Sequence, residues 1–124
     1  MSLVGCSYKK DVTNDPRFNG ICSKNVRTKR ELRLYGFGYQ PGANELFDLT
    51  TTDQGKTNLI GFVPAGHPVK LTRITQHHDI GITWEQLQGE IGFKGQIYPF
   101  AFELGTSAYT EKWRRIFDSF ESTN

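Results

Sequence analysis

The chain has 124 residues and a formal net charge of only +2, so its length suits one domain with its own core. No apolar run approaches the length of a membrane-spanning helix, and the balanced charge gives no support to nucleic-acid binding. Nine Phe, five Tyr and two Trp predict an aromatic-rich core, while 13 Gly and five Pro predict many short elements joined by tight turns. This composition favours β structure.

The N-terminal quarter differs in charge from the rest of the chain. Residues 1–33 hold eight Lys or Arg against three acidic residues, whereas the remainder holds seven against ten. A basic segment of this kind suits a surface of anionic lipid headgroups, although a solvated strand face has the same composition.

The motif Leu3-Val4-Gly5-Cys6 lies near the start of the chain. A small residue before a cysteine lets a peptidase approach the bond between them, and the thiol is the nucleophilic group that a lipid can alkylate. The motif resembles the lipobox of bacterial lipoproteins, which implies lipid attachment at Cys6 and anchoring in a membrane. Because Ser7 rather than an aspartate follows, the resemblance implies the outer membrane, with the domain on its periplasmic face.

The alternative is that the tetrapeptide arises by chance and that Cys6 is an ordinary core or disulfide residue. Cys6 and Cys22 would then be free to pair in an oxidising compartment. Lipid attachment at Cys6 would prevent this pairing.

Residues 1–24 are predicted to be a processed N-terminus and a polar tether, and residues 25–124 a single domain. The stretch SYKKDVTNDPRFNG after Cys6 is polar, contains Asn-Asp-Pro and shows neither the period of a strand nor that of a helix. A stretch of this kind holds a folded domain away from a bilayer.

Alternation of apolar and polar side chains predicts five or six short strands in the first part of the domain, at residues 25–38, 45–51, 58–63, 69 onward, 79–93 and 96–104. Two turn segments, TTDQGK and VPAGHPV, separate some of them. Within residues 79–93 the alternation changes phase between Trp84 and Leu87, which predicts a β-bulge or an intervening turn.

The end of the chain changes period. Trp113, Ile116, Phe117 and Phe120 recur at helical spacing, and Thr110 is placed to cap the first turn. The pattern predicts a C-terminal helix of about three turns that packs over the sheet.

Two runs carry a second resemblance. NVRTKRELRLYGFG, followed by a loop and a strand, and then GFVPAGHPVKLTRI resemble small bacterial lipoproteins with SH3-like barrels. The expected fold class is therefore mainly β, a small SH3-like antiparallel barrel or sandwich with a C-terminal α-helix.

No motif in the sequence specifies a chemistry. His77 and Asp79 would lie on one face of a strand, and with His67 as third ligand they define the enzymatic alternative, a metal-assisted hydrolase. Glu85 and Glu90 are central acids, but their spacing does not require them to face each other across a cleft, and the simpler prediction is that both are exposed residues at the phase change. We therefore predict a non-enzymatic protein with no metal, no cofactor and no small-molecule substrate.

The candidate binding surface comprises Arg33, Tyr35, Phe37 and Tyr39, which share the parity assigned to solvent. Exposed aromatic rings beside a guanidinium group are typical of protein interfaces. The alternative is that the neighbouring glycines bend the strand and turn the rings inward.

These observations favour an outer-membrane lipoprotein that binds an envelope protein or polymer through this surface. A second possibility is an immunity-type lipoprotein that neutralises an envelope-targeted effector, which resembles the use of several small periplasmic lipoproteins.

Overall fold

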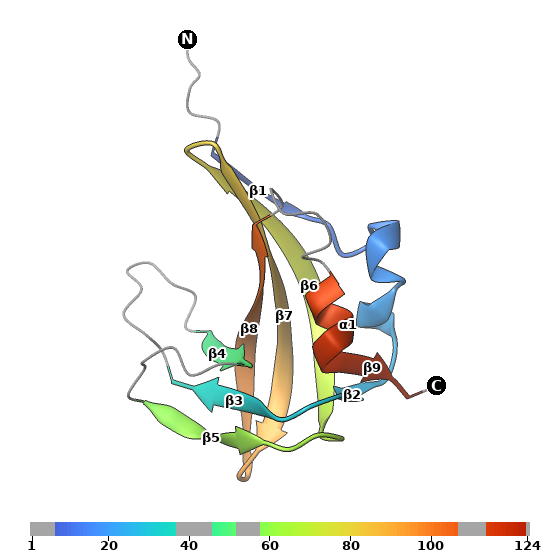
Figure 1. Cartoon of the computed structure of the whole chain (residues 1–124), viewed down its shortest axis with the longest axis vertical. Helices are drawn as coiled ribbons and strands as arrows, with labels where there is room; N and C mark the ends of the chain where they lie inside the picture. The colour runs from blue at the N-terminus through green and yellow to red at the C-terminus, as the bar shows by residue number, and fades with distance from the viewer. Residues whose placement is uncertain (1–6, 37–45, 52–57, 107–113, 124) are drawn as a thin grey trace.

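A computed structural model describes residues 7–36, 46–51, 58–106 and 114–123 (Figure 1). These ranges are mainly β, as the sequence predicts. The elements in chain order are β1 (Tyr8–Asp11), the 3-10 turns η1 (Pro16–Phe18) and η2 (Ile21–Ser23), β2 (Val26–Thr28), β3 (Leu32–Tyr35), β4 (Phe47–Thr50), β5 (Leu59–Val63), β6 (Pro68–Asp79), β7 (Ile82–Phe93), β8 (Gln96–Thr106), α1 (Arg115–Ser119) and β9 (Phe120–Ser122).

The described strands form one curled sheet in the order β5-β3-β4-β8-β7-β6-β2-β9, with β1 paired to β6. The long antiparallel strands β6, β7 and β8 form the central part of the sheet, and β4 runs parallel to β8. Because β2 and β3 follow each other in the chain but lie far apart in the strand order, the sheet must curl to bring them together. Figure 1 shows the resulting half-barrel, with β3 and β5 crossing in front of the long strands.

The curled sheet is held at Thr28, the last residue of β2. Its buried hydroxyl donates to the Pro64 carbonyl oxygen at 2.7 Å and accepts from the His67 N–H at 2.9 Å. The Thr28 backbone also bonds to Gly66 and His67. The turn between β5 and β6 is thereby joined to β2, which links the two ends of the strand order.

The core lies inside the curl and is rich in Leu, Ile and Phe. Fully buried side chains come from η1, β3, β4, β6, β7, β8, α1 and β9, and the largest are Phe18, Phe100, Phe120, Leu32, Leu34, Leu49, Leu71, Ile74, Leu87, Ile91, Leu104 and Ile116. The Phe102 and Phe120 rings meet edge to face at 5.2 Å. Aromatic packing of this kind adds to the area buried.

The prediction of a tether is wrong for the segment after Ser7. β1 pairs with β6 from Tyr8↔His78 to Asp11↔Thr75, and Phe18 and Ile21 are 0% and 2% exposed. The segment shows no period because β1 is an exposed edge strand and the two 3-10 turns that follow each bury one large side chain, Phe18 in η1 and Ile21 in η2. It belongs to the domain.

The phase change in residues 79–93 has two parts. A turn at Ile80-Gly81 ends β6 and starts β7, and the pairing of β7 with β8 is irregular between Glu85 and Gln86. The predicted slip between Trp84 and Leu87 therefore coincides with this irregularity.

The three-turn C-terminal helix is not confirmed. Residues 110–113, which include Thr110 and Trp113, lie outside the described residues, and α1 has five residues. Phe120 has extended backbone and pairs with Thr28 as the first residue of β9. Phe120 is therefore buried as part of a strand and not of a helix, because the edge of β2 offers backbone hydrogen bonds that a longer helix could not use.

Candidate functional site

The structure separates the residues of the predicted binding surface. Tyr35 is 2% exposed and Arg33 is half-buried, while Phe37 and Tyr39 lie outside the described residues. The assignment of Tyr35 to the solvent face is wrong. The pairing of β3 with β5 is irregular between Leu34 and Tyr35, so these neighbours are both buried and the alternation stops there.

A different aromatic residue stands beside Arg33. Phe62 of β5 pairs directly with Arg33 across the strands, and the guanidinium carbon lies 5.5 Å from the centre of the Phe62 ring. Phe62 is 49% exposed and Leu59 of the same strand is 42% exposed. We call Arg33, Leu59 and Phe62 the β5 surface. The sequence does not assign Phe62 to solvent, because LIGFV contains no polar residue that would mark an outer face.

The residues of the metal-site alternative do not come together. His67 precedes β6 and His77 lies near its far end, which separates them by roughly 30 Å along the strand. The His67 ring bonds the Gly92 carbonyl oxygen at 2.7 Å, at the opposite end from Asp79. Among the described residues no group of three or more His, Cys, Asp or Glu is placed to hold a metal ion.

Two aromatic pairs lie directly below the β6–β7 turn, one on each face of the ribbon formed by β1, β6 and β7. Tyr8 stacks on His78 at 5.0 Å, and His77 stacks on Trp84 at 5.3 Å. Each imidazole also bonds a threonine: His77 to Thr75 at 2.9 Å and His78 to Thr83 at 2.7 Å. Burial, and secondarily the charge of Lys9, lowers the pKa of His77.

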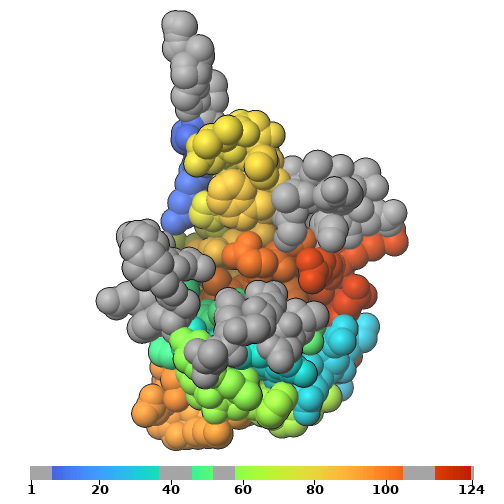
Figure 2. All heavy atoms as spheres, turned by 60° about the vertical axis from the view of Figure 1, so that its left-hand side comes forward, coloured from blue at the N-terminus to red at the C-terminus, as the bar shows by residue number. Residues whose placement is uncertain are grey.

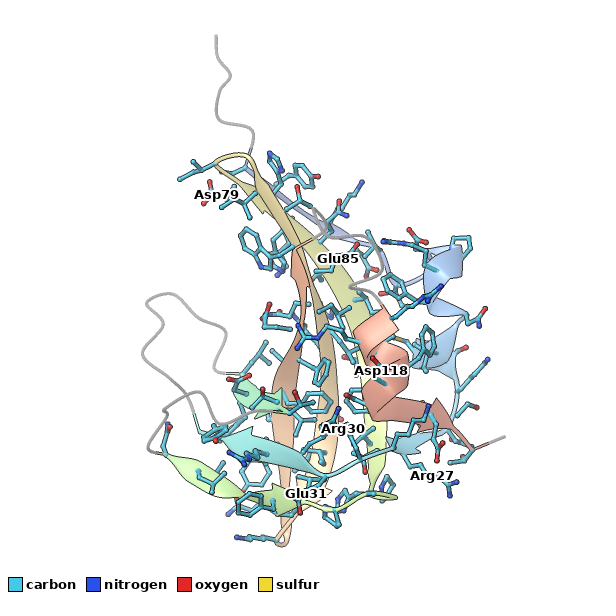
Figure 3. All side chains as sticks on the ribbon, viewed as in Figure 1. Arg27, Arg30, Glu31, Asp79, Glu85 and Asp118 are labelled. Atoms are coloured by element: carbon cyan, nitrogen blue, oxygen red, sulfur yellow. The ribbon has the colours of Figure 1, made fainter. Side chains whose placement is uncertain are left out.

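A buried ion pair between Arg17 and Glu85 lies below the aromatic pairs, next to the core. The Glu85 carboxylate is almost completely buried and accepts from Arg17 at 2.7 Å and from Gln76 at 3.2 Å. Figure 3 shows Asp79 at the hairpin end and Glu85 lower on the same hairpin, toward η1. The sequence places Glu85 at the phase change as an exposed residue, and this prediction is wrong because Arg17 arrives from the segment expected to be a tether.

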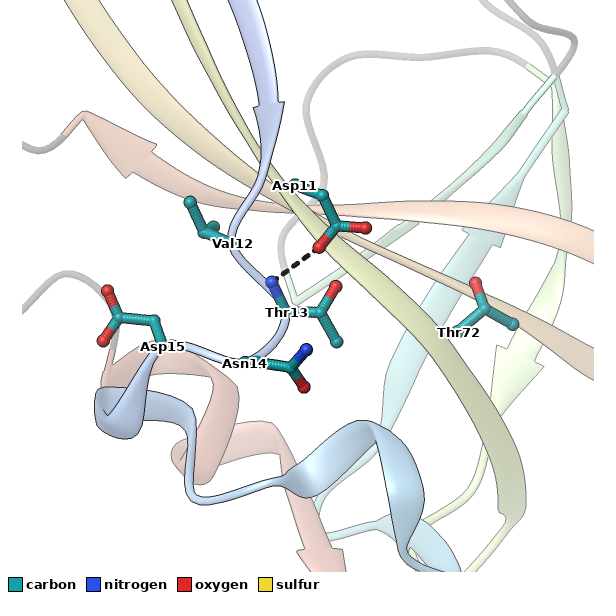
Figure 4. A pocket seen from close by; sticks show the side chains of 6 residues that line it. All are labelled: Asp11, Val12, Thr13, Asn14, Asp15 and Thr72. Carbon is teal, nitrogen blue, oxygen red and sulfur yellow. Dashed lines mark hydrogen bonds between the residues drawn. The ribbon is translucent and has the colours of Figure 1, made fainter.

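A shallow hollow lies beside the loop from Asp11 to Asp15, with Thr72 on its other side (Figure 4). The two carboxylates are used by their own loop: Asp11 accepts from the Thr13 N–H at 2.8 Å, and Asp15 accepts from the Arg17 N–H at 2.9 Å. Hydrogen bonding by the Thr13 side chain, and secondarily by its backbone N–H, lowers the pKa of Asp11, and hydrogen bonding by the backbone N–H and then the side chain of Arg17 lowers the pKa of Asp15. The carboxylates lie on opposite sides of the loop in Figure 4, so they do not form a joint ligand set.

A second hollow is lined by Lys24, Arg27 and Lys70, with Cys22 at its side. Arg27 is paired with Glu121 at 2.7 Å, and Cys22 is a half-buried free thiol. Burial, and secondarily the charge of Asp11, raises the pKa of Cys22 to about 11. A thiol with this pKa is a weak nucleophile at neutral pH, so it does not indicate a catalytic cysteine. Cys6 lies outside the described residues.

No protein-family model matches the chain, and the curated proteins and solved structures provide no significant match either. In the described ranges no helix has the length and apolar character needed to cross a membrane. Among the described residues, the β5 surface is the best candidate for contact with a partner.

Proposed function

We propose that this protein is a non-enzymatic lipoprotein, anchored to the outer membrane through a lipid on Cys6, that binds an envelope protein from the periplasmic side. An SH3-like barrel remains our prediction for the family of the fold. The predicted contact surface is now Arg33, Leu59 and Phe62 in place of the set that included Tyr35.

The observation that carries this proposal is the pairing of Arg33 with Phe62. Both belong to strands at one end of the sheet order, where β5 has a partner strand on one side only in the described residues. An exposed Phe ring under a guanidinium group offers apolar area and a charge together, the combination enriched at interface centres. Phe62 keeps about half of its surface exposed, at 49%.

The position of the β5 surface supports the proposal as well. Lys94, at the turn between β7 and β8, donates to the Ile60 carbonyl oxygen at 2.8 Å, so β5 lies at that end of the long hairpins. Ser7 lies at the other end, where its hydroxyl donates to Asp79 at 2.8 Å. A chain anchored through Cys6 would therefore present the β5 surface on the side away from the bilayer (Figure 1).

The partner expected from this chemistry is a protein that places an acidic side chain and an apolar side chain side by side. Photo-crosslinking in the native envelope tests it, with the photoreactive residue at position 62 and, as a matched control, at Ile97. Ile97 is 74% exposed at the same end but lies on β8. One discrete adduct from position 62 and none from position 97 is the expected result; equal labelling from both would reject the surface.

The anchor is tested separately by intact-mass analysis of the native protein from a membrane fraction. A mass gain equal to a diacylglycerol and an acyl chain, on the peptide that starts at Cys6, is expected. An unmodified Cys6 would reject the lipoprotein part of the proposal and leave the β5 surface to be judged by crosslinking alone.

A further inference from the structure

The turn between β6 and β7 uses an unsuitable residue. Asp79 pairs with Ile82, so Ile80 and Gly81 form a two-residue hairpin loop with φ of 51° and 75°. Such loops favour Asn-Gly or Asp-Gly, because the first residue must adopt a left-handed conformation that a β-branched side chain resists. Isoleucine at this position therefore costs folding free energy.

The Ile80 side chain recovers none of this cost by packing. It is 89% exposed, and Ile82 on the next strand is 53% exposed. Tyr8, on the adjacent strand β1, is 44% exposed. We call Tyr8, Ile80 and Ile82 the tip surface. Figure 2 shows this end of the hairpin projecting beside β1 from the body of the molecule.

The surroundings of the tip surface match the chemistry of a membrane interface. Tyr8 and Trp84 lie just behind the turn in the two stacked pairs, and aromatic rings of this type favour the headgroup region of a bilayer. The exposed Lys9 and Lys10 follow on β1, and the Lys10 ammonium group lies 5.8 Å from the Tyr8 ring centre. Among the described residues the exposed carboxylates beside them are Asp79, which accepts from the Ser7 hydroxyl, and Asp11, at the end of β1 away from the turn.

The shape also favours a bilayer over a protein. Three exposed apolar side chains, Ile80 in the turn, Ile82 on β7 and Tyr8 on β1, cannot supply the roughly 800 Å² per partner that a specific protein interface needs. Insertion among headgroups and acyl chains needs no complementary surface.

The tie between Ser7 and Asp79 fixes where an anchor would be. Ser7 is the first described residue and lies at the hairpin end, so a lipid on the residue that precedes it would enter the bilayer on this side of the domain. We infer that the tip surface, with Lys9 and Lys10 behind it, inserts into the interface of a bilayer that contains anionic phospholipid. This inference rests on the proposed lipid anchor for its biological setting, and it makes the β6–β7 hairpin the membrane-facing end of the domain.

Vesicle titration of the unlipidated full chain tests the inference. Cys6→Ser prevents disulfide formation, and Trp113→Phe leaves Trp84 as the single fluorescent reporter beside the tip. Vesicles of phosphatidylethanolamine with phosphatidylglycerol are expected to shift Trp84 emission to shorter wavelength. Ile80→Asp is expected to raise the half-saturating lipid concentration about tenfold or more, because one apolar side chain no longer leaves water.

The matched control is Ile97→Asp, the same substitution at an exposed isoleucine at the opposite end of the long hairpins. It is expected to leave the titration within about twofold of the parent, since its side chain remains in water. Ile80→Asn is the second variant, because asparagine tolerates the left-handed conformation and a loss of binding then does not reflect misfolding. Phosphatidylcholine vesicles are expected to bind more weakly, since Lys9 and Lys10 lose their anionic partners.

Three results would overturn the inference: no spectral shift at saturating lipid, equal losses from Ile80→Asp and Ile97→Asp, or undiminished binding to phosphatidylcholine. A lower sedimentation-equilibrium mass for Ile80→Asp without lipid, with lipid binding unchanged, would assign the tip to contact between two copies instead. Because the titrated chain carries no lipid, these results are independent of whether native Cys6 is modified.

Discussion

The two turns of the long hairpins have the same backbone but different surroundings. In the β6–β7 turn Ile80 and Gly81 have φ of 51° and 75°, and in the β7–β8 turn Lys94 and Gly95 have φ of 50° and 80°. The Lys94 side chain bonds Ile60, and the Phe93 ring lies so close to Gly61 that a Cβ there would stand 2.8 Å from it. The Ile80 side chain, at the position equivalent to Lys94, is 89% exposed.

One end of the sheet is therefore closed by side chains of the protein itself, and the tip end has no such closure in the described residues; we call them the closed end and the open end. At the β5 end, side chains from two turns and Thr28 tie the strands together. Among the described residues at the tip end, the contacts nearest the turn are the hydrogen bond from Ser7 to Asp79 and the two aromatic pairs, with the buried Arg17–Glu85 ion pair below them. Ile80 is unfavourable for the turn at the open end, and no packing within the domain compensates for it. We therefore attribute its presence to a contact outside the domain.

The first prediction concerns the buried Arg17–Glu85 ion pair, which we expect to stabilise the open end. Arg17→Ala leaves the buried Glu85 carboxylate without its cation and should lower the free energy of unfolding by about 3 kcal/mol. Urea denaturation measures it. The control is Arg27→Ala, which breaks the more exposed pair with Glu121 and should cost less than about 1 kcal/mol. Equal losses would show that the tip end does not depend on this ion pair.

The next effect concerns the closed end. Thr28→Val preserves the side-chain shape but leaves the Pro64 carbonyl oxygen and the His67 N–H without their partner, which should cost about 2 kcal/mol in urea denaturation. Thr28→Ser keeps the hydroxyl and should restore much of this loss. A Val variant as stable as the Ser variant would mean that Thr28 contributes only volume to the closure.

The direct comparison of the turns predicts a gain at one and none at the other. Ile80→Asn should raise the free energy of unfolding by about 1 kcal/mol, because the side chain that resists the left-handed conformation is replaced by one that accepts it. Lys94→Asn gives up the hydrogen bond to Ile60 and should yield no gain. Thermal denaturation of both variants decides, and an Ile80→Asn variant that is less stable would contradict the account of the turn.

The smallest effect is a pH dependence at the open end. Because the pKa of His77 is lowered from its ordinary value of 6.5, the unfolded chain binds this proton more readily than the folded one. The stability from a neutral His77 is therefore complete above that value and decreases as the pH falls through it. Comparing melting temperatures at about pH 8 and about pH 5 should show a smaller decrease for His77→Gln than for the parent. An identical decrease would assign the dependence to other groups.

The mainly β class and most strand positions could be predicted from the sequence, because a half-buried strand requires alternation of apolar and polar side chains. That alternation is visible in Val26, Leu32 and Leu34 and in Tyr98, Phe100 and Phe102. It also located the irregularity after Trp84, since a bulge shifts the parity of the pattern. The Pro64–Gly66 turn followed from local chemistry in the same way.

Contacts between side chains of different strands could not be predicted from the sequence. The burial of Tyr35, the exposure of Phe62 and the use of Glu85 by Arg17 all depend on pairing between segments distant in the chain, and alternation along one strand carries no information about its neighbours. The inclusion of residues 8–23 in the domain and the entry of Phe120 into β9 have the same cause: a free strand edge and a pocket for one large side chain were supplied by other parts of the fold.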